Sequence, residues 1–126
     1  MPPISEELMP QQVRDLIVRH IDSVAQLEAL LFLHARPSEQ WDVASVANRL
    51  YAPLADMAAA LRGLADDGFL VRNGEHYRYA RDSDRNMAVE MLAEAYVRYL
   101  VPITNLIHSK PRHIRAFSEA FKLRKE

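Results

Sequence analysis

Residues 42–80 constrain the fold of this chain more than any other stretch. Two segments in it carry apolar residues at helical spacing, residues 43–50 and a second segment that starts near Pro53. Asp42 is a suitable N-cap for the first helix, and Pro53 suits the first turn of the second, where a missing N–H costs nothing. Gly68 lies where a left-handed residue would end the second helix. The stretch therefore predicts a helix, a tight turn and a second helix.

Asn73 and Gly74 predict a β-hairpin after the second helix. Asn-Gly favours a two-residue type I′ turn, because the twist of that turn matches the twist of paired strands. With this turn Arg72 stands opposite Glu75, and such a pair contributes roughly 0.2–1 kcal/mol across the ladder. The face expected to point toward the core carries Leu70, Tyr77 and Tyr79, and the opposite face carries His76 and Arg78.

The remaining sequence is expected to form segments around this unit. Residues 1–9 are expected to be a loose arm, residues 10–82 one helix-turn-helix domain, and residues 83–126 a helical association segment. Within the domain, two further helices are expected, at residues 10–21 and 24–35, with Asp22 or Ser23 as the cap of the second. Trp41 is expected on a short strand that pairs with the hairpin.

A long helix is predicted from Asp84 to about Ile107, with Ser83 as its cap. Its apolar residues follow a heptad spacing, and Pro102 is expected to bend it or to end one segment and start another. This helix has more apolar surface than a small domain can cover, so we expect a homodimer. The residues expected at the dimer interface are Leu92, Ala95, Tyr96, Tyr99, Ile103 and Leu106.

The composition argues against several classes of function. The chain of 126 residues has no cysteine, so it has no disulfide and no cysteine-based zinc site. Its histidines show no metal-ligand spacing, and no phosphate loop or catalytic motif is present, so we expect no metal, no cofactor and no enzyme activity. The start of the chain does not resemble a signal peptide, and its apolar stretches are too short to span a bilayer. These features favour a cytoplasmic protein without membrane contact.

The stretch WDVASVANRLYAPLADMAAALRGLADDGFLVRNGEHYRYA resembles the winged helix-turn-helix family of bacterial transcription regulators, in the broad MarR-like sense. The ending AFSEAFKLRKE is similar to the tail of small stand-alone winged-helix proteins of bacteria. The resemblance implies a mainly α fold with a small β wing, a helical N-terminal layer and a long C-terminal dimerisation helix. It also implies a DNA-binding transcriptional regulator, in which the second helix of the motif enters the major groove.

The groove-facing positions of that second helix carry little positive charge. They are Ala55, Asp56, Ala58, Ala59, Arg62 and Gly63. DNA affinity comes largely from neutralised phosphates, and base reading needs donors and acceptors that alanine lacks. We therefore expect DNA contacts mostly through the wing and phosphates. The residues expected to make them are Asn48, Arg49, Arg62, Arg72, Asn73, His76, Arg78 and Arg81.

Two other functions fit the same sequence. The neutral face of the second helix suits a winged-helix module that docks a protein partner and binds no DNA. A ligand pocket beside Tyr96 and Tyr99 would make the protein a sensor, although core and dimer packing more commonly explain such an apolar stripe.

The C-terminal end is a local region of positive charge. From residue 110 onward there are six basic residues against Glu119 and Glu126. This charge indicates either a solvated face or a source of nonspecific DNA affinity. Residues 111–123 have the spacing of a short amphipathic helix that folds back on a groove. Its apolar positions are Ile114, Phe117, Phe121 and Leu123.

Overall fold

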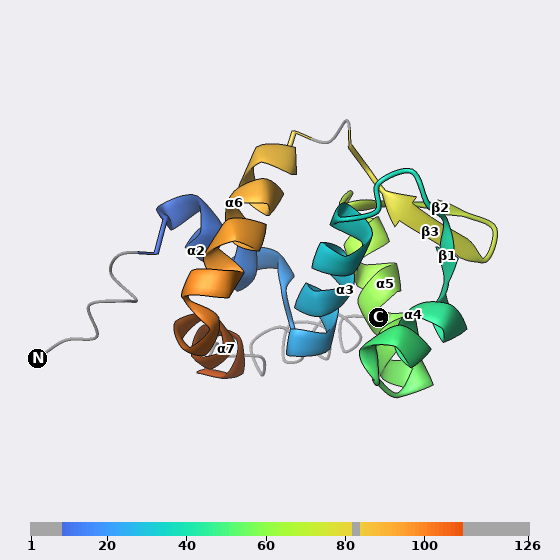
Figure 1. Cartoon of the computed structure of the whole chain (residues 1–126), viewed down its shortest axis with the longest axis horizontal. Helices are drawn as coiled ribbons and strands as arrows, with labels where there is room; N and C mark the ends of the chain where they lie inside the picture. The colour runs from blue at the N-terminus through green and yellow to red at the C-terminus, as the bar shows by residue number, and fades with distance from the viewer. Residues whose placement is uncertain (1–8, 82–83, 110–126) are drawn as a thin grey trace, which may run out of the picture.

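The computed structural model describes residues 9–81 and 84–109. It is mainly helical, with one small antiparallel sheet (Figure 1). In chain order the elements are α2 (Gln11–His20), α3 (Val24–His34), β1 (Trp41–Asp42), α4 (Val43–Leu50), α5 (Leu54–Asp66), β2 (Leu70–Asn73), β3 (His76–Tyr79), α6 (Asn86–Arg98) and α7 (Leu100–Ser109). The two central helices and the hairpin are therefore where residues 42–80 predict them.

The ends of the central helices follow from the capping residues. Asp42 caps α4, because its Oδ1 accepts a hydrogen bond from the N–H of Ser45 at 2.7 Å. Ser23 caps α3 in the same way, accepting from the N–H of Gln26 at 3.0 Å. Gly68 follows α5 with a φ of +88°, a left-handed conformation that glycine adopts without strain. The predicted cap of α4 and the predicted end of α5 are confirmed, whereas Pro53 stands at the N-cap position of α5 and not in its first turn.

The sheet has the strand order β1-β3-β2, and Trp41 pairs with Tyr77 as expected. The predicted register of the hairpin is wrong. Asn73 pairs with His76, so Gly74 and Glu75 form the two-residue loop and Arg72 stands opposite Tyr77 instead of Glu75. This register forms four residue pairs, and it places Gly74, with a φ of +64°, at the first central position of the loop. Leu70, Tyr77 and Tyr79 are buried, as predicted for the core face.

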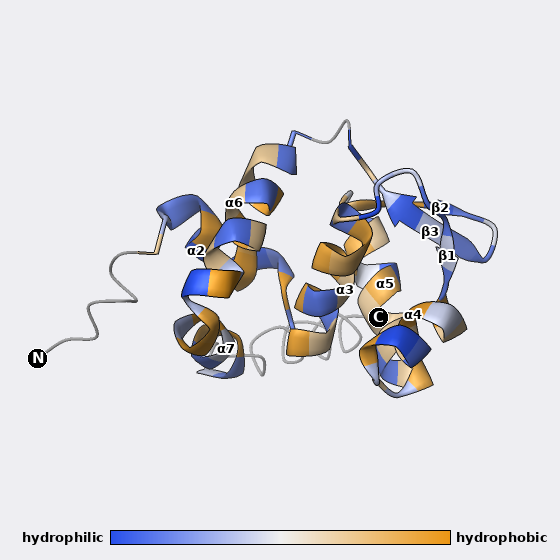
Figure 2. Cartoon of the chain, in the orientation of Figure 1, coloured by the Kyte–Doolittle hydropathy of each residue, from blue (hydrophilic) through white to orange (hydrophobic). Residues whose placement is uncertain are grey.

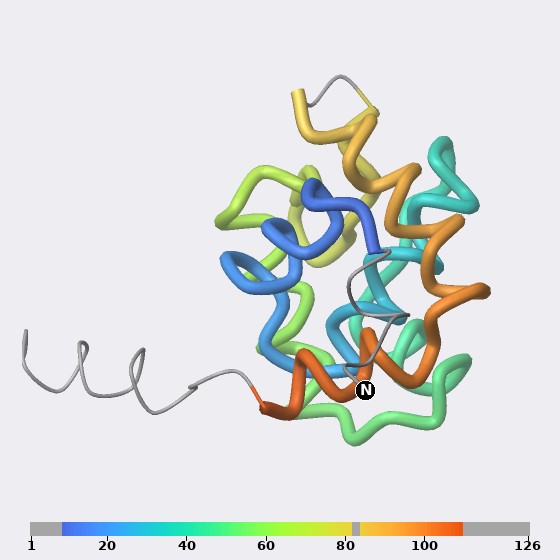
Figure 3. Tube along the Cα trace, turned by 90° about the vertical axis from the view of Figure 1, so that its left-hand side faces the viewer, coloured from blue at the N-terminus to red at the C-terminus, as the bar shows by residue number. Residues whose placement is uncertain are grey.

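The core runs through the whole described part of the chain. Figure 2 shows α3 as predominantly hydrophobic. This composition fits its position, since α3 contacts α4, α5, α6 and β3. Helix α2 packs beside α6, as Figures 1 and 3 show, and one continuous set of buried residues extends from Met9 to Ile107. The expected boundary at residue 82 therefore does not divide the core, and α6 and α7 belong to the same packed unit as α2–α5.

The expected break in the C-terminal helix is confirmed. Helix α6 ends at Arg98 and α7 begins at Leu100, with Tyr99 between them in a non-helical conformation. Pro102 lies in the first turn of α7 and has no N–H to donate to the C=O of Arg98, four residues earlier, so the break falls between Arg98 and Leu100. Ser83, the expected cap, lies outside the described residues, as does the segment from residue 110 onward.

One buried polar side chain links α3 to α5. Gln26 is 5% exposed, and its Oε1 accepts from the N–H of Asp22 at 2.7 Å. Its Nε2 donates to the C=O of Ala60 at 3.1 Å. A Cβ atom on Gly63 would lie 2.9 Å from that Nε2. A larger residue at position 63 would therefore displace the Gln26 amide from its hydrogen bond to Ala60.

Candidate functional site

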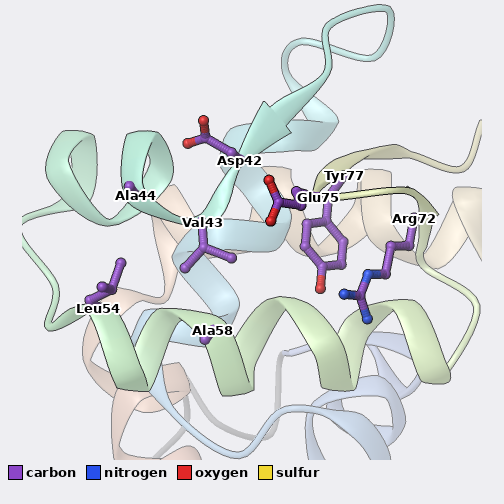
Figure 4. Close-up of a pocket in the computed structure, with 8 residues that line it drawn as sticks. All are labelled: Asp42, Val43, Ala44, Leu54, Ala58, Arg72, Glu75 and Tyr77. Atoms are coloured by element: carbon purple, nitrogen blue, oxygen red, sulfur yellow. The ribbon is translucent and has the colours of Figure 1, made fainter.

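A concave surface lies between α4, α5 and the hairpin (Figure 4). We call it the hollow, and its volume is about 440 Å³. It is lined by Asp42, Val43, Ala44, Leu54, Ala58, Arg72, Glu75 and Tyr77. The turn between α4 and α5 and the hairpin register together set its shape, so residues distant in sequence converge there.

The hollow has an apolar floor and charged groups at its rim. In Figure 4, the Tyr77 ring and the Arg72 side chain point toward α5, and the Glu75 carboxylate points toward Val43. Arg72 is held in place, because its Nε donates to the C=O of Gly74 at 3.0 Å and its guanidinium lies 5.7 Å from the centre of the Tyr77 ring. Its positive charge therefore stays beside Tyr77, at one end of the hollow.

Asp42 contributes a stable negative charge to the same rim. The hydrogen bond from the Ser45 N–H is the main cause that lowers the pKa of the Asp42 carboxyl, and the nearby His76 adds to it. Asp42 is therefore ionised at neutral pH. Asp42 lines the hollow as Glu75 does, but in Figure 4 its carboxylate points away from Tyr77 and Ala58.

Two large apolar side chains are exposed beside the hollow. Tyr51 is 96% exposed and Leu54 is 59% exposed. Tyr51 also has a φ of 56°, the left-handed conformation, which costs a non-glycine residue about 1–2 kcal/mol. The buried positions of α5 are Met57, Ala60, Leu61 and Leu64. Leu54 precedes this series in the sequence, and that position was the one signal that it is not a core residue. Sequence reasoning assigned no role to either residue.

The outward face of α5 is nearly free of positive charge. Ala55 and Ala59 are exposed there, with Arg62 as the basic residue and Asp56 and Asp66 as acidic ones. The corrected hairpin register adds to this, because it moves Glu75 from a strand position to the tip of the hairpin loop. The surface formed by α5 and the hairpin tip therefore carries the carboxylates of Asp56, Asp66 and Glu75.

The residues predicted to contact DNA are all exposed, but they do not share one face. In the hairpin, His76 and Arg78 lie on the side opposite the buried Tyr77, whereas Arg72 lies on the same side as Tyr77. Arg49 of α4 lies near the Trp41 ring, at 5.4 Å from its centre. The full set of exposed predicted residues is Asn48, Arg49, Arg62, Arg72, Asn73, His76, Arg78 and Arg81.

The residues predicted for a dimer interface are mostly used within the chain. Leu92, Ala95, Ile103 and Leu106 are buried in the core, and Tyr96 and Tyr99 are half-buried against it. The hydroxyl of Tyr96 donates to Glu28 on α3 at 3.4 Å, and burial together with this carboxylate raises the pKa of Tyr96. The heptad spacing therefore serves packing of α6 and α7 within one chain, and a dimer interface formed by these residues stays a prediction. The large apolar residues that these two helices expose are Met87, Val97, Leu100 and Val101.

A second, smaller concave surface lies between the start of α2 and the outer side of α6. Its volume is about 250 Å³, and it is lined by Pro10, Met91, Glu94, Ala95, Arg98 and Tyr99. The sequence suggested a ligand pocket beside Tyr96 and Tyr99. Of these two residues, Tyr99 lines this second surface.

Within residues 9–81 and 84–109, no group of three or more metal-ligating side chains comes together. No helix in the same residues is long and apolar enough to cross a bilayer. The chain matches no protein-family model, no curated protein and no solved structure. The site must therefore be interpreted from its own geometry.

Proposed function

We propose that the protein is a winged helix-turn-helix module that docks a protein partner on the face formed by α5 and the hairpin. The order of α4, α5 and the hairpin, with β1 as a third strand beside β3, supports the winged-helix assignment. The observation that carries the function is the hollow, together with the exposed Leu54 that lines it and the exposed Tyr51 in the turn before α5.

The chemistry of this face favours a protein over DNA. Protein interfaces have apolar cores with aromatic anchors and a polar rim, and their charged residues are depleted at the centre. The hollow has this arrangement, with Val43, Ala58 and Tyr77 inside and charged side chains at the rim. A DNA-binding face needs several cations positioned on phosphates, and the exposed face of α5 carries Arg62 against Asp56 and Asp66.

The conformation of Tyr51 supports the same function. Glycine or asparagine would relieve the left-handed strain at this turn, and the Tyr51 ring is almost entirely exposed to solvent. Strained backbone positions often cluster at binding sites, where the side chain is needed for something other than folding. Tyr51 is therefore the first anchor that we assign to the docking face.

Crosslinking from position 54 tests the proposal. A photoreactive amino acid in place of Leu54 is expected to give a discrete protein adduct in cells that express the chain, and the same group in place of Arg19 on α2 is expected to give none. Tyr51→Gly is expected to reduce the adduct while raising the free energy of unfolding by about 0.5–1 kcal/mol, because glycine relieves the strain. Equal adducts from positions 54 and 19 would contradict a docking face.

DNA binding through the hairpin is the second candidate, and the exposure of Arg72, Arg78 and Arg81 favours it. If it is correct, the chain retards random duplex at low salt, and the affinity falls steeply with salt concentration. Arg72→Ala combined with Arg78→Ala is then expected to reduce the slope of log K against log salt by about 1.8, from two lost phosphate contacts. Arg19→Ala combined with Arg98→Ala removes the same charge elsewhere and is expected to leave the slope unchanged. No retardation at low salt excludes this candidate.

We place the docking function in the cytoplasm, and the support for this location is the cysteine-free sequence.

A further inference from the structure

The positive and negative charges of this chain are unevenly distributed along the sequence. Residues 9–109 contain ten arginines, no lysine and thirteen acidic residues, whereas residues 110–126 contain six basic residues and two acidic ones. The C-terminal segment thus has a net charge of +4, and the part that folds around the hollow has a net charge of −3. Opposite charges of this size attract the segment to the folded part.

The apolar residues of the C-terminal segment also suit a concave surface. Ile114, Phe117 and Phe121 are spaced by three and four residues, which is the pattern by which an amphipathic helix inserts its anchors into a groove. Arg115 and Lys122 lie next to these anchors in the sequence. A partner of this kind brings aromatic side chains for an apolar floor and cations for a carboxylate at its rim.

The hollow supplies both halves of this complement. Val43, Ala58 and Tyr77 present apolar surface inside it, and Glu75 presents a carboxylate that points toward Val43, with the cation of Arg72 at the other end. Asp56 is exposed on the first turn of α5, but it lies about two residues around the helix from Leu54 and Ala58 and therefore outside the hollow. A fully covered Phe side chain buries roughly 150–250 Å² of surface. It is therefore a suitable anchor for such a concave surface.

We propose that the hollow of one copy receives residues 111–123 of a second copy. This inference rests on the proposed docking function and names its partner. Helix α7, which leads into the segment, contacts α2 and α6, and Figure 1 shows it on the opposite side of α3 from the hairpin. Helix α7 thus lies away from the hairpin of its own chain, and the segment that follows it is assigned to the hollow of a second copy. Reciprocal exchange of the two segments makes a closed dimer.

The exposed stripe on α6 is the competing surface for the same segment. Met87, Val97, Glu90 and Glu94 are exposed on it, so it too combines apolar and acidic residues. It is the outer face of a single helix, however, and Met87 and Val97 line neither of the two concave surfaces described above. The hollow is preferred because three elements surround an inserted side chain there.

Paramagnetic broadening between two copies tests the proposal. The chain has no cysteine, so Ser118→Cys gives one thiol for a nitroxide label. Copies that carry the nitroxide are mixed with ¹⁵N copies that carry no nitroxide. The amide signals of the ¹⁵N copies are then measured. We expect the signals of Val43, Ala44 and Ala58 to broaden, and an excess of a synthetic peptide of residues 110–126 to restore them.

Matched variants of the ¹⁵N copy locate the contact. Ala58→Glu places a carboxylate and extra volume inside the hollow and is expected to abolish the broadening. Ala59→Glu introduces the same residue one position along α5, outside the hollow, and is expected to leave it unchanged. If Ala58→Glu does not give a folded spectrum, Glu75→Lys at the hairpin tip is expected to weaken the broadening at least several-fold, and Glu94→Lys on α6 is expected to leave it intact.

Several results overturn the inference. They are broadening confined to Met87 and Val97, no broadening between copies, or full broadening in a folded Ala58→Glu chain. Crosslinking from position 54 to a different protein, with no broadening between copies, would keep the docking function and reject the second copy as its partner. The absence of both an adduct and broadening would reject both.

Discussion

Replacing Gln26 with alanine is expected to lower the free energy of unfolding by about 2–4 kcal/mol. The change removes the Oε1 that accepts from the Asp22 N–H and the Nε2 that donates to the Ala60 C=O, and it leaves a space between α3 and α5. An unmet hydrogen-bonding group in a buried position costs about 1–3 kcal/mol, and the cavity adds to that cost. Chemical denaturation monitored by circular dichroism measures the effect.

Gln11→Ala is the matched control for this variant. Gln11 is exposed on α2, where its side chain donates to Asp15 at 2.8 Å, so its removal is expected to change stability by less than about 0.5 kcal/mol. A similar loss of stability in both variants would contradict a buried polar link between α3 and α5.

Gly63→Ala gives a second test of the same link through a double-mutant cycle. In the native background the new Cβ would lie 2.9 Å from Gln26 Nε2, so Gly63→Ala is expected to destabilise the fold. In the Gln26→Ala background that clash is absent, and the better helix propensity of alanine is expected to stabilise by about 1 kcal/mol. The same substitution should thus change sign between the two backgrounds.

Tyr79 is expected to make the stability of the fold decrease between about pH 10 and pH 12. Burial of its ring is the main cause that raises the pKa of Tyr79 to about 12, with the Glu90 carboxylate as a second cause. Its hydroxyl donates to Asn86 Oδ1 at 2.6 Å, and Asn86 donates to Glu90 at 3.2 Å, so the neutral form is held between β3 and α6. Above pH 10 the unfolded chain releases this proton and the folded chain keeps it.

The direction of the effect follows from proton linkage. The unfolded state binds fewer protons than the folded state in this range, so the free energy of unfolding falls as pH rises. Two pKa units correspond to about 2–3 kcal/mol, which is present below pH 10 and lost by pH 12. Tyr79→Phe is expected to lose about 1 kcal/mol at neutral pH from the missing hydrogen bond, and to lack this part of the alkaline decrease.

Urea denaturation at several pH values from 8 to 12 measures the effect, and Tyr51→Phe serves as the control because its hydroxyl is exposed. Identical pH profiles for the native chain and Tyr79→Phe would contradict the expected coupling.

Local signals in the sequence predicted much of the fold. Asp42 and Ser23 cap their helices, Gly68 follows α5 in a left-handed conformation, and Pro102 separates α6 from α7. Each of these residues acts on its own backbone or within one turn, so its effect can be inferred without knowing the rest of the structure.

The hairpin register and the use of the heptad seam were not predictable in this way. Asn73-Gly74 suits one type of two-residue turn and Gly74-Glu75 suits another. The Gly74-Glu75 turn is the one that pairs Leu70 with Tyr79 at the far end of the strands. The seam through Leu92 and Ile103 has the same spacing whether it faces a second copy or α2. Only the tertiary arrangement distinguishes these alternatives.

The candidate site was predicted in part. The sequence shows that Arg62 is the one cation among the groove-facing positions of α5, and the structure leaves Arg62 exposed there. The hollow depends on how α4, α5 and the hairpin meet, and the exposure of Tyr51 depends on the turn that joins the two helices, so neither follows from spacing within one helix.

The way α5 is attached to the core has a consequence for how this protein can diverge among related chains. Met57, Leu61 and Leu64 are buried, and Gln26 holds the backbone of α5 at Ala60, so the hold on α5 comes entirely from its inner side. Ala55 and Ala59, on its outer side, are exposed. Substitutions at these two positions can therefore accumulate with little penalty in stability, while both the scaffold and the hollow beside Ala58 are preserved.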